Sequence, residues 1–516
     1  MKTESRCLRM IKKKMVRVLT VAGLLACLAS GCASGGSSVG KEAAADEIKK
    51  GGFTVAASCH DPQIIREGDT YYMFGSHMVG AKCQDLRKWN YFANGVDAAN
   101  TLFDNLLTEP YAAFDFVGKN TDNGYSVWAS NVIYNETMKK YVMYFCTTSS
   151  YVKSTLCFAT ADNIEGPYTY VDTILYSGYG KSNISETNLY DVLGKNADIS
   201  RYLEYGGYNN KEWPNCIDPA IFTDADGRMW MNYGSWSGGI FLLEIDPTTG
   251  YPIYPVDDKD ADPYYGYRLI GGGHHSAEGP YIQYDAENGY YYLFVSYGDL
   301  QSDGGYQIRQ FRSEKPTGPY VDVAGNTLED QDDHFNYGLK MMGNYTFPSL
   351  NYTYMAPGGQ STFQDDDGKY YITYHQRFDD GTEYHEPRVH QMYTNEDGWF
   401  VAAPFATMGE TLSEKGYKKS DVSGTFYVVN YGTDISSKIR EAEAYTFADG
   451  KVTGGEKSGT YEVKEGTDYI TITLDGVVYK GVLMEMTDEA ENPVFCFSAA
   501  GDNEETLWGV QYIQKE

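Results

Sequence analysis

The feature that most constrains this chain is a strand–turn–strand motif that occurs five times. Each copy has a polar residue at the start of a short strand, a tight turn, and then an aromatic-rich strand that ends in small or polar residues. The copies are "CHDPQIIREGDTYYMFGSH" (59–77), "ASNVIYNETMKKYVMYFC" (129–146), "IDPAIFTDADGRMWMNYGS" (217–235), "AEGPYIQYDAENGYYYLFVSYGDL" (277–300) and "GQSTFQDDDGKYYITYHQRF" (359–378). Five such units, each with about four short strands, predict a five-bladed β-propeller over residues 52–405.

The starts of the repeated strands predict a site. Spacing between the copies is irregular, so we expect insertions of unequal length between blades. In a propeller the first strand of each blade lines the central channel, and residues at its start face one shared cavity. Asp61, Asp218 and Glu278 take the same position in three copies, so we expect three carboxylates to converge there. The alternative is that Asp-Pro and Glu-Gly-Pro only form turns.

The tail of the chain follows a different pattern. Residues 412–516 alternate apolar and polar side chains in short runs such as "DYITITLDGVVYKGVLMEM", which predicts a small C-terminal antiparallel β-barrel domain. The 48 tyrosines and 55 glycines of the 516-residue chain also suit many short strands joined by turns. We therefore expect an all-β protein. The barrel could support the propeller, bind polysaccharide or cover an edge, and we favour support.

The N-terminus is typical of an exported protein. A basic segment precedes a short apolar run and the sequence "LASGC", which ends at Cys32. This order predicts a secretory signal peptide over residues 1–31, and its end resembles the lipobox of bacterial lipoproteins. The resemblance implies lipidation of Cys32, a flexible tether over residues 32–51, and anchoring to the outer face of a bacterial cell membrane. A plain signal peptide with an incidental cysteine is the alternative.

The charge of the chain excludes some partners. Residues 1–31 contain seven Lys or Arg and one Glu, so their removal takes the net charge from −29 to −35. Such a chain is repelled by nucleic acid and anionic lipid, so we expect no nucleic-acid partner and no membrane contact except through the lipid. A neutral polymer is a more suitable substrate. The six cysteines after Cys32 are widely spaced without a CxxC pair, which leaves zinc unsupported and disulfide pairing open.

At its acidic motifs the chain resembles glycoside hydrolase family 43, in particular the extracellular endo-α-1,5-L-arabinanases. The resemblance covers about residues 52–405 and rests on "HDPQII", "NCIDPAIF" and "SAEGPYI", in that order. It implies a five-bladed propeller, in agreement with the repeat count. It also implies inverting hydrolysis of internal α-1,5-linked bonds in plant cell-wall arabinan or arabino-oligosaccharides. The tail resembles the small barrel that follows some of these propellers.

One segment departs from the family pattern. Many relatives begin the second unit with a Trp-Ala-Pro-Asp type sequence, whereas this chain has "VWASNVIYN", with Ser130 and Asn131. Because the three acidic positions lie elsewhere, we expect the departure to affect substrate contacts rather than the reaction.

The resemblance assigns roles to the three carboxyls. Cleavage of a glycosidic bond requires an acid that protonates the leaving oxygen and a base that activates water. Asp61 is expected to be the general base and Glu278 the general acid. Asp218 is expected beside Glu278, where it would raise the pKa of the acid by like-charge repulsion and hold its orientation. Inversion places base and acid roughly 6.5–9.5 Å apart, so that water fits between them.

Four residues are expected to contact the substrate: His60, Trp128, Asn215 and Ser235. The histidine precedes the base and could bond to it or to a sugar hydroxyl, and the tryptophan could stack on a sugar ring. Packing within the fold is the alternative for both. The family pattern places the asparagine and the serine near the sugar. The role of the two histidines in "GGGHHSAEGP", at positions 274 and 275, stays open.

A calcium ion is also implied by the resemblance. In the family a histidine in the segment "ITYHQRF" meets one Ca²⁺ on the propeller axis, which gives His375 this role. Calcium prefers oxygen ligands, so the ion would be largely water-coordinated, with the acidic cavity supplying the field. A buried structural histidine is the alternative. "DADG" (224–227) and "DDDG" (365–368) lack the later glutamate of a calcium loop, and we expect blade turns there.

Two other functions are compatible with the sequence. An exo-acting α-L-arabinofuranosidase or β-xylosidase of the same family would differ in the loops around the cavity, which sequence patterns describe poorly. A non-catalytic glycan-binding surface lipoprotein is the alternative from another class. Such a module would gain nothing from a second carboxylate that opposes ionisation of the first.

Overall fold

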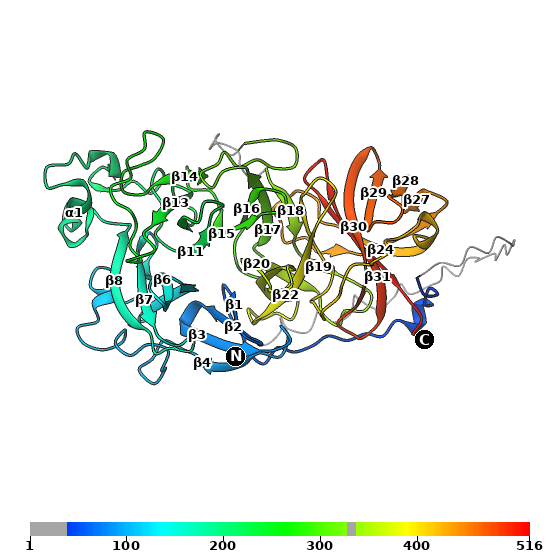
Figure 1. The fold of residues 1–516 in the computed structure, drawn as a ribbon, viewed down its shortest axis with the longest axis horizontal. Helices are drawn as coiled ribbons and strands as arrows, with labels where there is room; N and C mark the ends of the chain where they lie inside the picture. Colours follow the sequence, from blue (N-terminus) through cyan, green and yellow to red (C-terminus); the bar gives the residue numbers. More distant parts are fainter. Residues whose placement is uncertain (1–38, 328–336, 516) are drawn as a thin grey trace, which may run out of the picture. The chain divides into compact units, whose positions relative to one another are not determined.

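A computed structural model describes residues 39–327 and 337–515 (Figure 1). The expected signal peptide and Cys32 lie outside the described residues. In the described part of the chain the only α-helix is α1 (Leu189–Leu193), which lies with the hairpin β9 (Leu203–Glu204) and β10 (Gly207–Tyr208) in an insertion between the second and third blades. None of its helices has the length and apolar character needed to cross a bilayer.

Five sheets follow one another along the chain, each with a blade of four consecutive antiparallel strands, and the fifth sheet is extended by two further short strands. They contain β1 (Gln63–Glu67), β2 (Thr70–Gly75), β3 (Val79–Cys83) and β4 (Asn90–Ala93) in blade 1; β5 (Ser126–Asn135), β6 (Lys140–Ser150), β7 (Lys153–Ala161) and β8 (Thr169–Tyr176) in blade 2; β11 (Ala220–Thr223), β12 (Met229–Tyr233), β13 (Ile240–Ile245) and β14 (Tyr267–Ile270) in blade 3; β15 (Glu278–Asp285), β16 (Tyr290–Tyr297), β17 (Gln307–Ser313) and β18 (Leu339–Met342) in blade 4; and β20 (Tyr354–Gln364), β21 (Tyr370–Phe378), β22 (His385–Thr394) and β23 (Phe400–Ala402) in blade 5.

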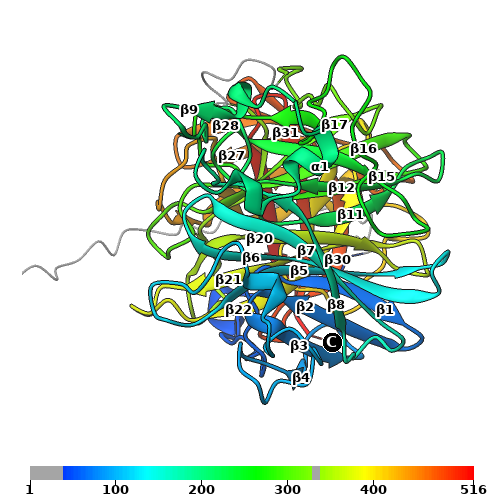
Figure 2. The ribbon, with the colours of Figure 1, turned by 90° about the vertical axis from the view of Figure 1, so that its left-hand side faces the viewer.

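The first strand of each blade belongs to an inner ring. β1 contacts β5 and β20, β11 contacts β5 and β15, and β15 contacts β20, so the ring closes. Figure 2 shows the blades from the side on which β7 and β8 face the viewer. The predicted five-bladed propeller is confirmed, because each repeated motif supplies the first two strands of one blade.

The turns between these strands form where the sequence supplies Asp and Gly. Between β11 and β12, Asp224 Oδ1 accepts hydrogen bonds from the backbone N–H groups of Asp226 and Arg228, both at 2.9 Å. Gly227 and Gly368 take the left-handed backbone that these turns require, with φ of 80° and 85°. The two Asp-rich segments are therefore blade turns, as predicted.

The C-terminal strands form the predicted barrel, which is closed. Its strands are β24 (Gly424–Asn430), β26 (Glu443–Ala448), β27 (Lys451–Gly454), β28 (Lys457–Val463), β29 (Tyr469–Leu474), β30 (Val477–Thr487), β31 (Pro493–Gly501) and β32 (Thr506–Tyr512). Buried aromatic side chains such as Phe426, Phe447 and Phe497 fill its interior. Between β24 and β26, the short β25 (Arg440–Glu441) pairs with β19 (Tyr345–Thr346) and extends the sheet of blade 5.

The segment before the propeller differs from the expected flexible tether. Residues 41–51 hydrogen bond to the folded protein: Ala43 N donates to Tyr512 O at 2.8 Å and Gly51 N donates to Ser349 O at 2.9 Å. Gln514 N in turn donates to Lys41 O at 2.7 Å, so the start of this segment and the end of the chain satisfy each other's backbone groups. A flexible tether therefore does not include these residues.

Candidate active site

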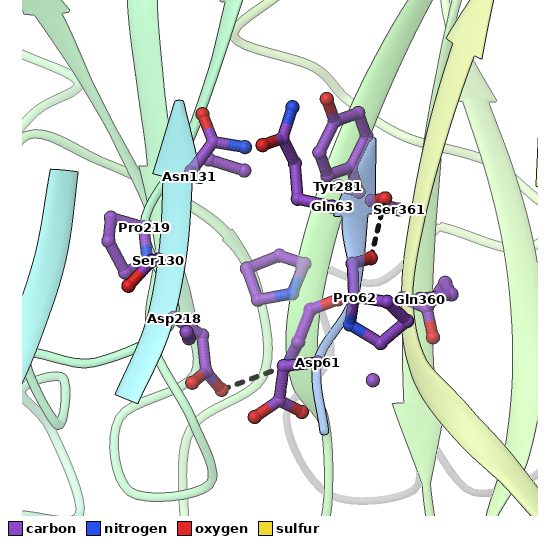
Figure 3. Close-up of a pocket in the computed structure, with 15 residues that line it drawn as sticks. Asp61, Pro62, Gln63, Ser130, Asn131, Asp218, Pro219, Tyr281, Gln360 and Ser361 are labelled. Atoms are coloured by element: carbon purple, nitrogen blue, oxygen red, sulfur yellow. Dashed lines mark hydrogen bonds between the residues drawn. The ribbon is translucent and has the colours of Figure 1, made fainter. Parts of the chain in front are cut away.

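The inner strands surround a small central cavity of about 40 Å³ (Figure 3). Each blade contributes three consecutive residues to it, and the first of each triplet has left-handed backbone with φ between 47° and 57°. These five residues are Asp61, Ala129, Asp218, Gly279 and Gly359. These five left-handed residues therefore occupy equivalent positions in the five blades.

This equivalence corrects one prediction. Asp61 and Asp218 occupy the same position, but the matching residue of blade 4 is Gly279, so Glu278 lies one residue earlier. The Asp-Pro pairs correspond to the Gly-Pro pair rather than to the glutamate. A β-bulge between Glu278 and Tyr281 accompanies the left-handed glycine. As a result Asp61 and Asp218 line the central cavity, whereas Glu278 lines the larger cleft beside it.

Asp61 lies just before β1 and has two hydrogen-bonding neighbours. Its Oδ2 accepts a hydrogen bond from Ser76 Oγ at 2.6 Å and lies 2.7 Å from His60 Nδ1. Burial favours the neutral acid, but His60 and the Ser76 hydroxyl outweigh it and lower the pKa of Asp61 below its usual value. Asp61 is thus ionised near neutral pH, as a general base must be.

Asp218 and Glu278 bind protons more tightly than Asp61 does. Burial raises the pKa of Asp218 well above its usual value, and the charges of Asp61 and Glu278 raise it further. Burial also raises the pKa of Glu278, although hydrogen bonds from Tyr306 and Ser235 oppose the shift. Together the carboxyls divide into one ionised group and two groups with raised proton affinity.

Hydrogen bonds fix the carboxylate of Glu278 in the cleft. Its Oε2 accepts from Ser235 Oγ at 3.0 Å and from Trp236 Nε1 at 3.1 Å, and its Oε1 accepts from Tyr306 OH at 2.8 Å. Asp218 Oδ2 accepts from the backbone N–H of Gly279 at 3.1 Å, so Asp218 holds the segment that carries Glu278. In Figure 3 the carboxylates of Asp61 and Asp218 point toward the same end of the central cavity.

The cleft beside Glu278 has a volume of about 700 Å³. Three of the four predicted substrate contacts line it, namely Trp128, Asn215 and Ser235, and His274 lines it as well. Among the described residues Asn215 Oδ1 is a buried oxygen without a hydrogen-bond partner. His275 is not among the lining residues. The Ser235 hydroxyl, which was expected to contact the sugar, contacts Glu278.

Ser130 and Asn131 lie on the central cavity instead of the cleft. Asn131 Oδ1 accepts a hydrogen bond from Ile221 N at 3.2 Å, so its amide joins blades 2 and 3. The departure from the family pattern thus falls on packing around the axis rather than on the wall of the cleft.

His375 lies on β21 in a ring stack beside Asp61. It is fully buried, and neither ring nitrogen has a hydrogen-bond partner among the described residues. Its ring stacks on His60 with 4.0 Å between centroids, and its Nδ1 lies 4.0 Å from Asp61 Oδ1. Burial, with His60 and Arg377 nearby, lowers the pKa of His375 well below its usual value, which leaves a neutral imidazole.

Gly359 keeps the space between Asp61 and His375 open. A Cβ atom at this position would overlap Asp61 Oδ1 and come within 2.8 Å of His375 Nδ1. The ligand atoms of His60, Asp61 and His375 lie within 4.8 Å of one another, a spacing that can hold a cation. A buried imidazole without partners, a carboxylate and a protected space fit a partly hydrated divalent ion.

Sequence patterns missed several residues of the site. Trp236 and Tyr306 bond to Glu278, while His77 lines the cleft and His385 packs edge-on against His60 with 5.2 Å between centroids. Tyr306 immediately precedes the third strand of its blade, where the repeat gave no signal. Trp236 directly follows Ser235 in the Gly-rich segment "YGSWSGG", which was the one available hint.

Hydrolysis of a glycosidic bond requires a base and an acid whose proton affinities differ, beside a cleft that admits a sugar chain. The propeller provides this arrangement, which places the protein among the propeller glycoside hydrolases. The comparisons with known proteins agree. The family model described as glycosyl hydrolases family 43 matches residues 192–400, and that described as a C-terminal lipocalin-like domain matches residues 404–509.

The chain is similar to known proteins over most of its length. It is 38% identical over 467 residues to extracellular endo-α-(1→5)-L-arabinanase 2 of Bacillus subtilis, covering 88% of this chain and 92% of that protein. It is 36% identical over 472 residues to the extracellular endo-α-(1→5)-L-arabinanase of Thermotoga petrophila, covering 88% and 94%. The chain belongs to glycosyl hydrolases family 43.

Solved structures give the same result. A family 43 glycoside hydrolase from Bacillus licheniformis aligns with a TM-score of 0.78 at 36% identity, covering 90% of this chain and all of that one. The crystal structure of endo-1,5-α-L-arabinanase from T. petrophila aligns with a TM-score of 0.76 at 35% identity, with the same coverage.

Proposed function

We propose that this protein hydrolyses internal α-1,5-L-arabinofuranosidic bonds of arabinan or arabino-oligosaccharides with inversion. The observation that carries the proposal is the opposite shift in pKa at Asp61 and Glu278 beside the cleft that Trp128 and Asn215 line. The names of the two relatives above, both endo-arabinanases, supply the substrate.

In the proposed reaction Asp61 accepts a proton from the attacking water, and Glu278 donates a proton to the leaving oxygen. Asp218 orients the acid through the backbone of Gly279. Burial and the charges of Asp61 and Glu278 raise the pKa of Asp218, so this group opposes the presence of further negative charge beside Glu278. His60 bonds to the base, and Trp128 and Asn215 offer a ring face and an acceptor oxygen to the sugar chain. Residues 52–405 would be the catalytic domain, and residues 412–516 an accessory domain.

The site around His375 fits the calcium ion that the family resemblance implies. His375 would supply one ring nitrogen, with water as the remaining ligands, and Gly359 would leave space for them. When bound, the ion would supply positive charge that keeps Asp61 ionised. We further propose that the protein is secreted, like relatives named as extracellular, and anchored through a lipid on Cys32.

Sizing the products from linear arabinan tests the substrate and the mode of attack. A soluble form from residue 33 onward should yield a ladder of short oligosaccharides from linear arabinan and little product from arabinoxylan or galactan. Arabinose as the sole early product, with rapid release from a nitrophenyl arabinoside, would show exo-action instead. Binding to arabinan without turnover in the unmodified chain would identify a glycan-binding module.

A further inference from the structure

Glu278 is surrounded by hydrogen-bond donors from two blades. Ser235 and Trp236 precede β13 of blade 3 and donate to Oε2, while Tyr306 precedes β17 of blade 4 and donates to Oε1. Both carboxylate oxygens are therefore bound, and the plane of the head group is fixed. An indole N–H can only donate, so the contact from Trp236 favours a negatively charged Oε2.

The backbone that aims Trp236 at the acid is strained. Trp236 and Ser237 have φ of 46° and 43°, a left-handed conformation that non-glycine residues rarely adopt. Segments next to Glu278 hold them in place: Trp236 N donates to Ala277 O, and His274 N donates to Ser237 O, both at 2.9 Å. The surrounding segments hold the strained backbone of Trp236 in place, and its indole N–H donates to the acid. This combination indicates a role in the reaction.

Tyr306 connects the acid to the base. Its side chain is buried and stacks on His375 with 5.7 Å between ring centroids and 20° between planes. A Cβ atom on Gly358 would overlap the Tyr306 ring, so this glycine admits it. His375 stacks in turn on His60, which lies 2.7 Å from Asp61. A column of rings thus joins the two reacting carboxyls and fixes the position of the Tyr306 hydroxyl.

We propose that Trp236 and Tyr306 are positioning residues that stabilise the negative charge on Glu278 as it gives up its proton to the leaving group. This inference rests on the proposed function. Donors aimed in advance at a developing charge favour the transition state over the neutral ground state, because they need no reorganisation during the reaction. The titratable groups that face Glu278 are Asp61, Asp218, His60 and Tyr306. The two variants below leave the carboxyls of Asp61 and Asp218 and the imidazole of His60 in place.

Trp236→Phe and Tyr306→Phe test the proposal, because each removes one donor and keeps a ring. Removing a donor to the ionised form makes the acid hold its proton to higher pH. The alkaline limb of the kcat/KM profile on arabinan should therefore move up by about half to one pH unit, and kcat at the optimum should fall about tenfold. KM should change little, since neither donor is needed to bind the ground state.

Matched controls separate positioning from general destabilisation. Trp230→Phe removes an indole N–H that donates to Asp224 Oδ2 at 2.8 Å, and Tyr144→Phe removes a buried hydroxyl that donates to Gly250 O at 2.9 Å. Both bonds lie away from the cleft, so neither control should move the alkaline limb. If the alkaline limb of the kcat/KM profile lies at the same pH in all four variants and in the unmodified enzyme, the proposal is wrong, whatever the change in rate.

A second readout does not depend on the substrate. With δ-¹³C-labelled glutamate, the carboxyl resonance that is absent from Glu278→Gln can be titrated in the free protein. Its midpoint should rise in Trp236→Phe and Tyr306→Phe and stay unchanged in the two controls. Unchanged midpoints would overturn the inference, whereas raised midpoints in a protein inactive on arabinan would support it and refute only the proposed substrate.

Discussion

Replacement of Gly359 by alanine tests whether the space between Asp61 and His375 is needed for the reaction. The substitution has two effects that the structure separates. The first is the backbone: Gly359 has φ of 57°, and a left-handed alanine costs about 1–2 kcal/mol of stability. The second is contact, since the new Cβ would overlap Asp61 Oδ1 and lie 2.8 Å from His375 Nδ1.

Gly368→Ala isolates the first effect. Gly368 lies in the exposed turn between β20 and β21 of the same blade, has φ of 85°, and has no atom within 4 Å of the position that a Cβ would take. Both variants should lose a similar amount of stability from the backbone, with a Tm shift of at most about 2 °C for a unit of this size.

Activity should distinguish them sharply. An overlap of this kind displaces the base by about 1 Å, and a misplacement of that size costs about 100-fold in rate. We expect kcat/KM on linear arabinan to fall about 100-fold in Gly359→Ala and less than about twofold in Gly368→Ala. Thermal unfolding and steady-state kinetics on the two proteins provide the comparison. Equal activities would show that the space beside the base has no function.

Three further predictions concern the acid, the metal and the barrel. Glu278→Gln should lose about 1,000-fold or more in kcat while still binding arabinan in calorimetry, because the amide cannot give up a proton. Chelation should lower the activity of the unmodified enzyme, and added Ca²⁺ should restore it, whereas the residual activity of His375→Gln should respond to neither. Burial and Asp322 raise the pKa of Glu504 to about 8, so its contribution to stability is complete below its unfolded value and is lost as the pH rises toward 8. Glu504→Gln should therefore raise Tm at pH 8.5 but not at pH 4.5, while Glu505→Gln, whose carboxyl has a lowered pKa in the fold, should lower Tm at pH 8.5.

The repeat predicted the propeller because the same strand–turn–strand unit occurs five times, once for each blade. Each copy supplies an inner strand, a turn and a second strand, and closure of the ring brings together the distant Asp61, Asp218 and Glu278. The barrel was predictable for a similar reason, since alternation with short turns leaves few other folds. The repeat was aligned one residue out of register at blade 4, because Gly279, and not Glu278, occupies the left-handed position that Asp61 and Asp218 occupy in their blades.

Sequence patterns missed Tyr306 and Trp236 because the positions of these side chains depend on tertiary contacts that a local pattern does not contain. Tyr306 belongs to the second half of its blade, and it meets Glu278 only because the chain returns past the acid. Trp236 requires a left-handed backbone at a non-glycine residue, which local propensity argues against. Likewise, residues 41–51 are held by hydrogen bonds to Tyr512 and Gln514 at the end of the chain and to Ser349 in the propeller. A prediction of flexibility from composition does not include such contacts between distant residues.

The configuration of the first product tests the central account most directly. Proton NMR spectra recorded during the first minutes of hydrolysis of a linear α-1,5-arabino-oligosaccharide would show the new anomeric carbon before mutarotation. If Asp61 activates water on the face opposite the leaving group that Glu278 protonates, the β-anomer should form first and the α-anomer should follow by mutarotation. Initial appearance of the α-anomer would require a covalent intermediate and would contradict the roles given to these two carboxyls.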